Sequence, residues 1–157
     1  MPFHARAQFF RWTILAARVF LGVVFLYAAY TKLRLPWQIF AMSINSYQLL
    51  PEWVVILTAR TLPAFELVLG LLLIAGYKLR YVAAVSTALL GFFLGIMIRS
   101  YVVGLGIDCG CFGVGEALSV NTLVRDSLLA LLSLGLTVAA FRQQRNSKLE
   151  IRNSAPA

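Results

Sequence analysis

The sequence predicts an all-α fold: an integral membrane four-helix bundle, with a short interfacial helix between the first two spans and both termini in the cytoplasm. Two observations lead to this prediction. Hydrophobic residues make up 61% of the 157-residue chain, whereas a soluble domain contains about 45–50% apolar residues. These residues are concentrated in four runs, each close to the ~20 residues that a helix needs to cross a bilayer.

The four spans are predicted at about residues 12–33, 53–76, 81–101 and 121–141, which makes residues 1–141 a single membrane domain. The first run follows a basic flank, as a signal peptide does. However, it is longer than the usual ~7–15-residue core and contains Arg18, so we expect an uncleaved span. The polar tail, residues 142–157, is expected to be cytoplasmic and disordered.

A short amphipathic helix is predicted between Pro36 and Pro51. Its apolar residues follow the i, i+3, i+4, i+7 spacing of one helical face: Trp37, Phe40, Ala41 and Ile44. Such a helix is typical of the membrane interface. An ordered loop packed on the bundle is the alternative.

Small and polar residues suggest how the spans end and pack. Gly76 is suited to end the second span, and Asn121 is suited to cap the start of the fourth. Gly91 and Gly95 are four residues apart in the third span, a spacing that allows close contact between helices.

The distribution of charge predicts the orientation of the chain. The net charge of +8 does not indicate nucleic-acid binding, because most cations fall on one side of a four-span topology. These are Arg6, Arg11, Lys78, Arg80, Arg142, Arg145, Lys148 and Arg152. The opposite side carries Lys32, Arg34 and Arg99. The positive-inside rule therefore predicts a multi-pass protein of the bacterial inner (cytoplasmic) membrane, with the segment between spans three and four facing the periplasm or the extracellular space.

Both cysteines lie in that outer segment, within Asp108-Cys109-Gly110-Cys111-Phe112-Gly113. Gly110 tolerates the turn that would let Cys109 and Cys111 form a disulfide. A strained or exposed disulfide is labile, and so short a loop gains little chain-entropy stabilisation from closure. The pattern therefore favours a redox-active pair, with a structural disulfide or two inert thiols as alternatives. No metal site is predicted, because zinc needs four ligands and the one histidine, His4, falls on the other side.

Charged neighbours bear on the reactivity of this pair. A carboxylate at Asp108 would disfavour a thiolate at Cys109 unless Arg99 or Arg125 offsets it. Asp108 could instead accept a proton during exchange, or be a solvated turn residue. The whole chain has two cysteines. It therefore holds no second cysteine pair that could return Cys109 and Cys111 to their starting redox state. It needs a partner dithiol or a bound acceptor.

Five polar side chains are predicted within or at the edges of the spans: Arg18, Lys32, Arg60, Glu66 and Asp126. Buried ionisable groups usually face partners or a cavity. Counting ~1.5 Å per residue from the cytoplasmic side allows Arg18 to reach Glu66. Such pairs would fix helix order and register. The alternative is a polar pocket that opens toward the cysteine segment and holds an anionic or quinone-like ligand.

With these residues in view, the chain resembles the MauE family, named for methylamine utilisation, within the wider DoxX-like group of small four-helix membrane proteins. The resemblance spans about residues 18–141, and DCGCFG at 108–113 is its most specific element. The other matching stretches are Arg18 with Leu21-Gly22, Ala28-Ala29-Tyr30-Thr31-Lys32-Leu33, Ser46-Tyr47-Gln48-Leu49-Leu50-Pro51, Leu62-Pro63, Glu66-Leu67, Gly70 and Arg125-Asp126.

The resemblance implies a redox-associated membrane protein with Cys109 and Cys111 as its redox pair. It also implies a role beside a thioredoxin-like partner in maturing the disulfide-rich small subunit of methylamine dehydrogenase. The sequence therefore favours a thiol–disulfide oxidoreductase that exchanges electrons with an exported thioredoxin-fold protein. The alternatives are a DoxX-type quinone-linked oxidoreductase subunit and a non-catalytic membrane assembly factor.

Overall fold

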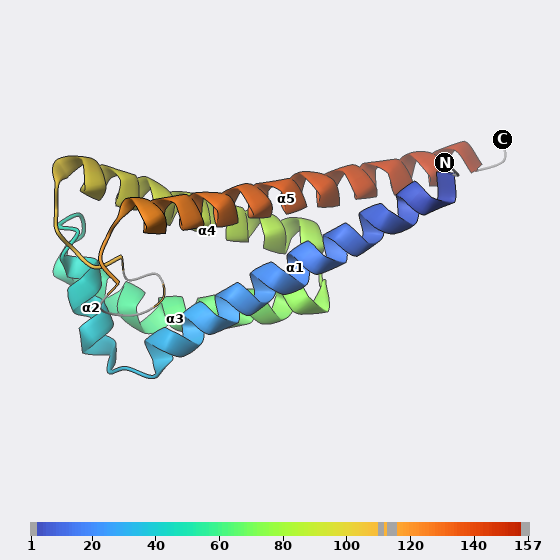
Figure 1. Ribbon diagram of the computed structural model, residues 1–157. Helices are drawn as coiled ribbons and strands as arrows, with labels where there is room; N and C mark the ends of the chain where they lie inside the picture. Colours follow the sequence, from blue (N-terminus) through green and yellow to red (C-terminus); the bar gives the residue numbers. More distant parts are fainter. Residues whose placement is uncertain (1–2, 110–111, 113–115, 155–157) are drawn as a thin grey trace.

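The computed structural model describes residues 3–109, 112 and 116–154, and this part of the chain forms five α-helices (Figure 1). They are α1 (Phe3–Leu33), α2 (Trp37–Asn45), α3 (Glu52–Ala75), α4 (Leu79–Val103) and α5 (Val120–Ser154). No strand occurs in these residues, which hold one isolated β-bridge, between Asp108 and Ala117. The predicted all-α fold is confirmed.

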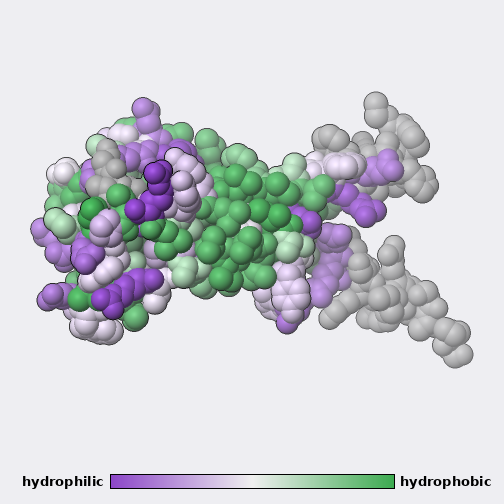
Figure 2. Space-filling view, turned by 90° about the horizontal axis from the view of Figure 1, so that it is seen from below, coloured by the Kyte–Doolittle hydropathy of each residue, from purple (hydrophilic) through white to green (hydrophobic). Residues whose placement is uncertain are grey.

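Four helices are long and apolar enough to cross a membrane: α1 from Phe10, α3, α4, and α5 as far as Arg145. Their side chains form a broad hydrophobic band around the middle of the molecule, with hydrophilic residues toward its ends (Figure 2). A surface of this kind is suited to hydrocarbon and not to water. The protein is therefore a multi-pass membrane protein, as the hydropathy pattern predicts.

The long helices pack as two pairs, α1 beside α3 and α4 beside α5 (Figure 1). Helix α2 and the segment between α4 and α5 lie together at one end of the bundle, which we call the loop end. Helix α1 begins and α5 finishes at the opposite, terminal end. The two pairs meet in a core to which α1, α3, α4 and α5 contribute, built around Leu21, Phe25, Leu69, Leu73, Val82, Ala83, Leu129 and Leu136.

Two glycines set the close approach of α1 and α3. A Cβ added to Gly70 would lie 2.8 Å from the carbonyl oxygen of Gly22, and a Cβ on Gly22 would lie 2.9 Å from that of Gly70. Gly91 and Gly95 behave differently, because an added Cβ meets nothing within 4 Å at either position. The predicted close contact at Gly91 and Gly95 is therefore not made within the described chain.

Helix α2 confirms the predicted amphipathic helix and shows what its apolar face contacts. Phe40 is buried in a small cluster with Ala59 and Leu62 of α3. The other three apolar residues of the predicted face pack against the same cluster. Helix α2 is thus fastened to the bundle and forms part of its loop end.

Of the predictions about where the helices begin and end, one is confirmed and two are wrong. Gly76 ends α3 with a φ of 71°, and its N–H bonds the carbonyls of Leu72 and Leu73. Helix α5, however, is capped by Ser119: the Ser119 N–H donates to Thr122 Oγ1 (2.9 Å), and the Thr122 N–H donates to Ser119 Oγ (3.4 Å). Asn121 lies inside this helix.

The C-terminal tail also differs from the prediction. Helix α5 continues to Ser154, so residues 142–154 are helical and not disordered. These residues are mostly good helix formers, with no glycine or proline among them, so the backbone of the span has no reason to stop at Phe141.

Candidate functional site

A cavity of about 240 Å³ lies between the two helix pairs at the loop end. Every helix contributes to its walls, as do Cys109 and Phe112 of the segment between α4 and α5. Most lining side chains are leucine, valine, isoleucine and phenylalanine. The polar side chains in its walls are Lys32, Ser43, Tyr47, Thr58, Glu66, Cys109 and Asp126.

Cys109 reaches the cavity because its segment folds back on itself. The Cys109 N–H donates to the carbonyl of Glu116 (2.7 Å), and the Leu118 N–H donates to the carbonyl of Ile107 (2.9 Å). With the bridge between Asp108 and Ala117, residues 107–109 therefore run antiparallel beside residues 116–118. Side chains alternate along such extended backbone, and that of Cys109 is turned inward, leaving the residue 3% exposed.

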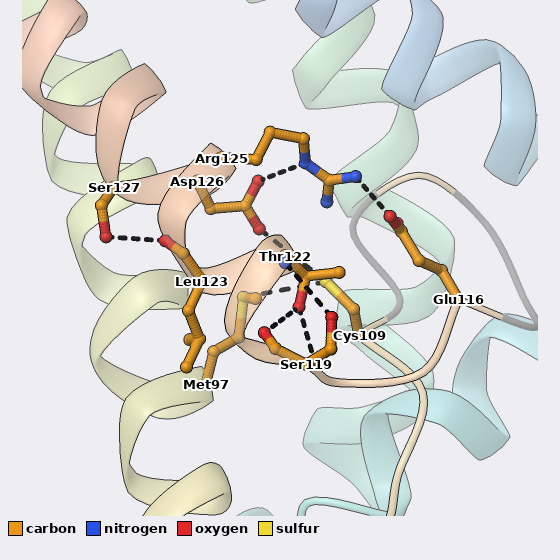
Figure 3. Close-up of polar contacts among 9 residues, drawn as sticks. All are labelled: Met97, Cys109, Glu116, Ser119, Thr122, Leu123, Arg125, Asp126 and Ser127. Atoms are coloured by element: carbon orange, nitrogen blue, oxygen red, sulfur yellow. Dashed lines mark hydrogen bonds and ion pairs between the residues drawn. The ribbon is translucent and has the colours of Figure 1, made fainter.

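Cys109 contacts residues of three elements, and Figure 3 shows its contacts with α4 and α5. Its sulfur lies 3.8 Å from Oδ2 of Asp126 on α5 and 3.8 Å from the sulfur of Met97 on α4. The Tyr47 hydroxyl, just after α2, donates to the Cys109 carbonyl over 2.7 Å. These contacts hold the cysteine at the junction of α2, α4 and α5, where its sulfur faces a carboxylate inside the bundle.

Asp126 is itself nearly buried, at 7% exposed. The Arg125 Nε donates to its Oδ1 over 3.1 Å, and Arg125 also forms an ion pair with Glu116. The Arg125 guanidinium lies 4.4 Å from the ring centroid of Phe112. Arg125 thus joins α5 to both sides of the cysteine segment and compensates one oxygen of Asp126, while the other oxygen faces Cys109 (Figure 3).

A buried ion pair forms a second polar feature of the cavity. Lys32 Nζ lies 2.6 Å and 2.8 Å from the two carboxylate oxygens of Glu66, and both residues are 5% exposed. The ammonium also lies 5.3 Å from the ring centroid of Phe40. Lys32 on α1 and Glu66 on α3 therefore neutralise each other in a mainly apolar wall.

The predicted contact between Arg18 and Glu66 is wrong, and helix register explains why. The Gly22–Gly70 contact sets a common level for α1 and α3. Arg18 lies four residues, or ~6 Å, from that level toward the terminal end. Glu66 lies four residues, or ~6 Å, toward the loop end. Arg18 instead packs its guanidinium over Gly76, where an added Cβ would lie 2.8 Å from the Arg18 Cζ.

The remaining predicted site residues whose structure is described, Arg60, Arg99 and Asp108, lie toward the loop end. The Arg60 guanidinium stacks on the Trp37 ring of α2, 4.4 Å from its centroid. Arg99 is exposed on α4 and forms no ion pair with any residue whose side chain is described. Asp108 takes part in the bridge to Ala117. Gly110 and Cys111 lie outside the described residues, so the disulfide between Cys109 and Cys111 stays a prediction.

Sequence reasoning missed three neighbours of Cys109: Tyr47, Met97 and Glu116. Tyr47 lay in one of the stretches that carried the family resemblance, and this was the one available signal for it. Glu116 is one of the few acids on the predicted outer side, and nothing in the sequence linked it to Cys109. Nothing in the sequence singled out Met97, an apolar residue inside a predicted span.

Fold and site together define a class: a multi-pass membrane protein whose helix bundle encloses a cavity with a cysteine and a carboxylate in its wall. The chain belongs to the MauE family, since the family model described as "Methylamine utilisation protein MauE" matches residues 10–139. Membership ties this membrane protein to methylamine utilisation. No curated protein and no solved structure matches the chain.

Proposed function

We propose that this protein is a membrane thiol–disulfide redox component, in which Cys109 and Cys111 cycle between dithiol and disulfide. The supporting observation is the position of the Cys109 sulfur, 3.8 Å from the Asp126 carboxylate at the edge of an intramembrane cavity. A cysteine with a purely structural role has no need of a charged acceptor inside a bilayer, where a buried charge is costly.

The exchange step conserves atoms and electrons. A thiolate of this protein attacks a partner disulfide, a mixed disulfide forms, and one partner thiolate leaves. The second cysteine then attacks the mixed disulfide, which gives the Cys109–Cys111 disulfide and a partner dithiol. Two electrons and two protons pass to the partner, and the reverse sequence returns them.

The burial of Cys109 supports different roles for the two cysteines. Attack on a sulfur requires access to it, and Cys109 is 3% exposed. We therefore assign contact with the partner to Cys111. Cys109 would be the resolving residue and would act from inside the bundle. Asp126 would accept the proton of Cys109 as the internal disulfide forms.

The partner that fits this scheme is an exported thioredoxin-fold protein. The basic residues near the terminal end favour an orientation with that end in the cytoplasm of a bacterial inner membrane. The cysteine segment would then face the periplasm, where disulfides form and persist. Given the family description, the pathway served would be maturation of an exported, disulfide-rich enzyme such as methylamine dehydrogenase.

Trapping tests this function. Cys109→Ser and Cys111→Ser variants are expressed singly in a cell that uses methylamine, quenched with acid and analysed without reductant. We expect Cys109→Ser to accumulate a mixed disulfide with an exported protein, because its remaining cysteine, Cys111, is the one assigned to the partner and no second thiol is present to resolve the mixed disulfide. If neither variant traps a protein, and wild-type cysteines label identically with and without reductant, the exchange function is wrong. Trapping by Cys111→Ser alone would reverse the assigned roles.

The cavity supports a second candidate, a quinone-linked oxidoreductase subunit. Its walls are mainly apolar and reach Cys109, with the Lys32–Glu66 pair as a polar group. A quinone of the bilayer fits such a cavity. In this candidate the cysteines are secondary, and the two electrons and two protons that convert the quinone to the quinol come from another subunit of the oxidoreductase.

Two variants separate these candidates, with quinone reduction and enzyme maturation as the measured activities. Activity that persists in Cys109→Ser/Cys111→Ser but is lost in Glu66→Gln supports the quinone-linked subunit. Maturation that persists in both variants supports a non-catalytic assembly factor. Glu66→Gln alone leaves the Lys32 charge buried and unpaired, so Lys32→Gln/Glu66→Gln serves as the control for folding.

A further inference from the structure

A groove of about 690 Å³ lies at the terminal end, far from the cysteine, between the first half of α1, the end of α3, the start of α4 and α5. Its walls contain two arginines, Arg11 and Arg18, and two amides, Gln8 and Gln143. No aspartate or glutamate occurs among the described residues that line it. The described part of the groove therefore offers hydrogen-bond donors and positive charge without a compensating acid.

Arg18 is the centre of this groove and has no acceptor in the described protein. Its Nε is buried without a hydrogen-bond partner. The guanidinium packs over Gly76, and a Cβ at that position would overlap Nη1. A guanidinium has five donors and stays charged, so inside a membrane span it requires an acceptor beyond the described residues.

The depth of the groove suits a lipid headgroup. Helix α1 becomes membrane-spanning at Phe10, so Arg11 lies at the interface. Arg18 lies seven residues further along α1 and thus on nearly the same face, ~10 Å deeper. Trp12, which is 69% exposed, also lines the groove, as expected of an aromatic side chain at the interface.

The surface beside the groove suits acyl chains. Leu15 lines the groove and is 36% exposed, and Val19, one turn further along α1, is 38% exposed. A free phosphate would not contact this apolar surface, whereas the acyl chains of a phospholipid would lie along it. Basic pockets between membrane helices are known to hold anionic headgroups.

We propose that this groove binds the phosphate of an anionic phospholipid in the leaflet at the terminal end, with Arg18 and Arg11 as its cationic ligands. Gly76 provides the space that lets the Arg18 guanidinium reach the phosphate. The site is independent of the cysteine pair and is present whether or not the thiol–disulfide function is correct.

Native mass spectrometry of the purified, detergent-solubilised protein tests this site. Phosphatidylglycerol, phosphatidylcholine and inorganic phosphate are compared at equal concentrations. We expect retained phosphatidylglycerol on the wild type. Arg18→Gln should weaken its binding about tenfold, in line with the loss of charge-assisted hydrogen bonds. Gly76→Ala should also weaken it, because the new methyl group displaces the guanidinium. Arg34→Gln is the control, as it removes one exposed cation at the loop end.

Each other outcome overturns the proposal. Equal losses in Arg18→Gln and Arg34→Gln would mean that binding reflects overall charge and not a site. Phosphatidylcholine bound as well as phosphatidylglycerol would remove the anionic specificity. Arg18-dependent binding of inorganic phosphate without a preference for the lipid would assign the groove to a soluble anion. If Arg18→Gln fails to fold, Arg11→Gln at the exposed rim decides, and unchanged lipid binding in that variant would contradict the site.

Discussion

At the scale of single residues, the acid that matters to Cys109 is distant in sequence. Asp108 directly precedes Cys109 and was therefore the acid expected to influence it. The structure instead places Oδ2 of Asp126 3.8 Å from the Cys109 sulfur. The reason is the antiparallel pairing of residues 107–109 with 116–118, which turns the Cys109 side chain toward α5. Spacing along the chain cannot reveal this, because the orientation depends on which backbone groups pair across the segment.

When the reduced protein reacts with a small disulfide reagent, Asp126→Asn should slow the second step, formation of the Cys109–Cys111 disulfide, by about a hundredfold, the lower range for loss of a general base. The amide keeps the shape of the side chain but cannot accept the proton of Cys109. Stopped-flow kinetics on purified protein measures the rate.

Asp108→Asn is the matched control for this experiment and should react at nearly the wild-type rate. Equal slowing in the two variants would show that charge near the segment, and not the contact with Asp126, governs reactivity. Unchanged kinetics in Asp126→Asn would remove this residue from the proposed mechanism.

At the scale of helices, hydropathy predicted the four spans and the apolar face of α2, because burial in lipid imposes a length and α2 packs through one helical face. It could not predict which helices pair. Lipid is as apolar as leucine, so association depends on close packing and polar contacts, which hydropathy does not encode. The same limit explains the failed pairing of Arg18 with Glu66: their depths were counted without the register that the Gly22–Gly70 contact sets.

The Gly22–Gly70 contact predicts unequal effects of two similar substitutions. Gly70→Ala places a methyl group 2.8 Å from the Gly22 carbonyl oxygen and should destabilise the bundle by about 1–3 kcal/mol through overpacking. Gly91→Ala meets nothing within 4 Å, and by helix propensity alone it should stabilise α4 by up to about 1 kcal/mol. Denaturant unfolding in detergent, followed by circular dichroism, measures both.

The result at Gly91 has a second use. A loss of stability there comparable to that at Gly70 would mean that Gly91 packs against something beyond a single described chain, such as a second copy. Equal and small effects at both positions would contradict the importance of the α1–α3 backbone contact.

At the scale of the whole molecule, the bundle has two different ends. Helix α2 lies at the loop end, opposite the terminal end (Figure 1). The cavity and Cys109 belong to the loop end, whereas the groove lined by Arg11 and Arg18 belongs to the terminal end. Basic loops are retained in the cytoplasm during insertion, and this asymmetry leads us to expect the loop end on the outside. The sequence alone supports this expectation, because the rule depends only on the charges that flank each span.

Site-directed labelling in intact cells tests this orientation. In a Cys109→Ser/Cys111→Ser background, Arg34→Cys introduces one thiol at the loop end and Lys78→Cys introduces one between α3 and α4. A membrane-impermeant maleimide should label the thiol at position 34 in intact cells and the one at position 78 only after permeabilisation. The reverse pattern would put the cysteine segment in the reducing cytoplasm, where a stable disulfide is rare. An exported thioredoxin-fold partner would then have no access to it, even though the cavity and the contact with Asp126 would be unchanged.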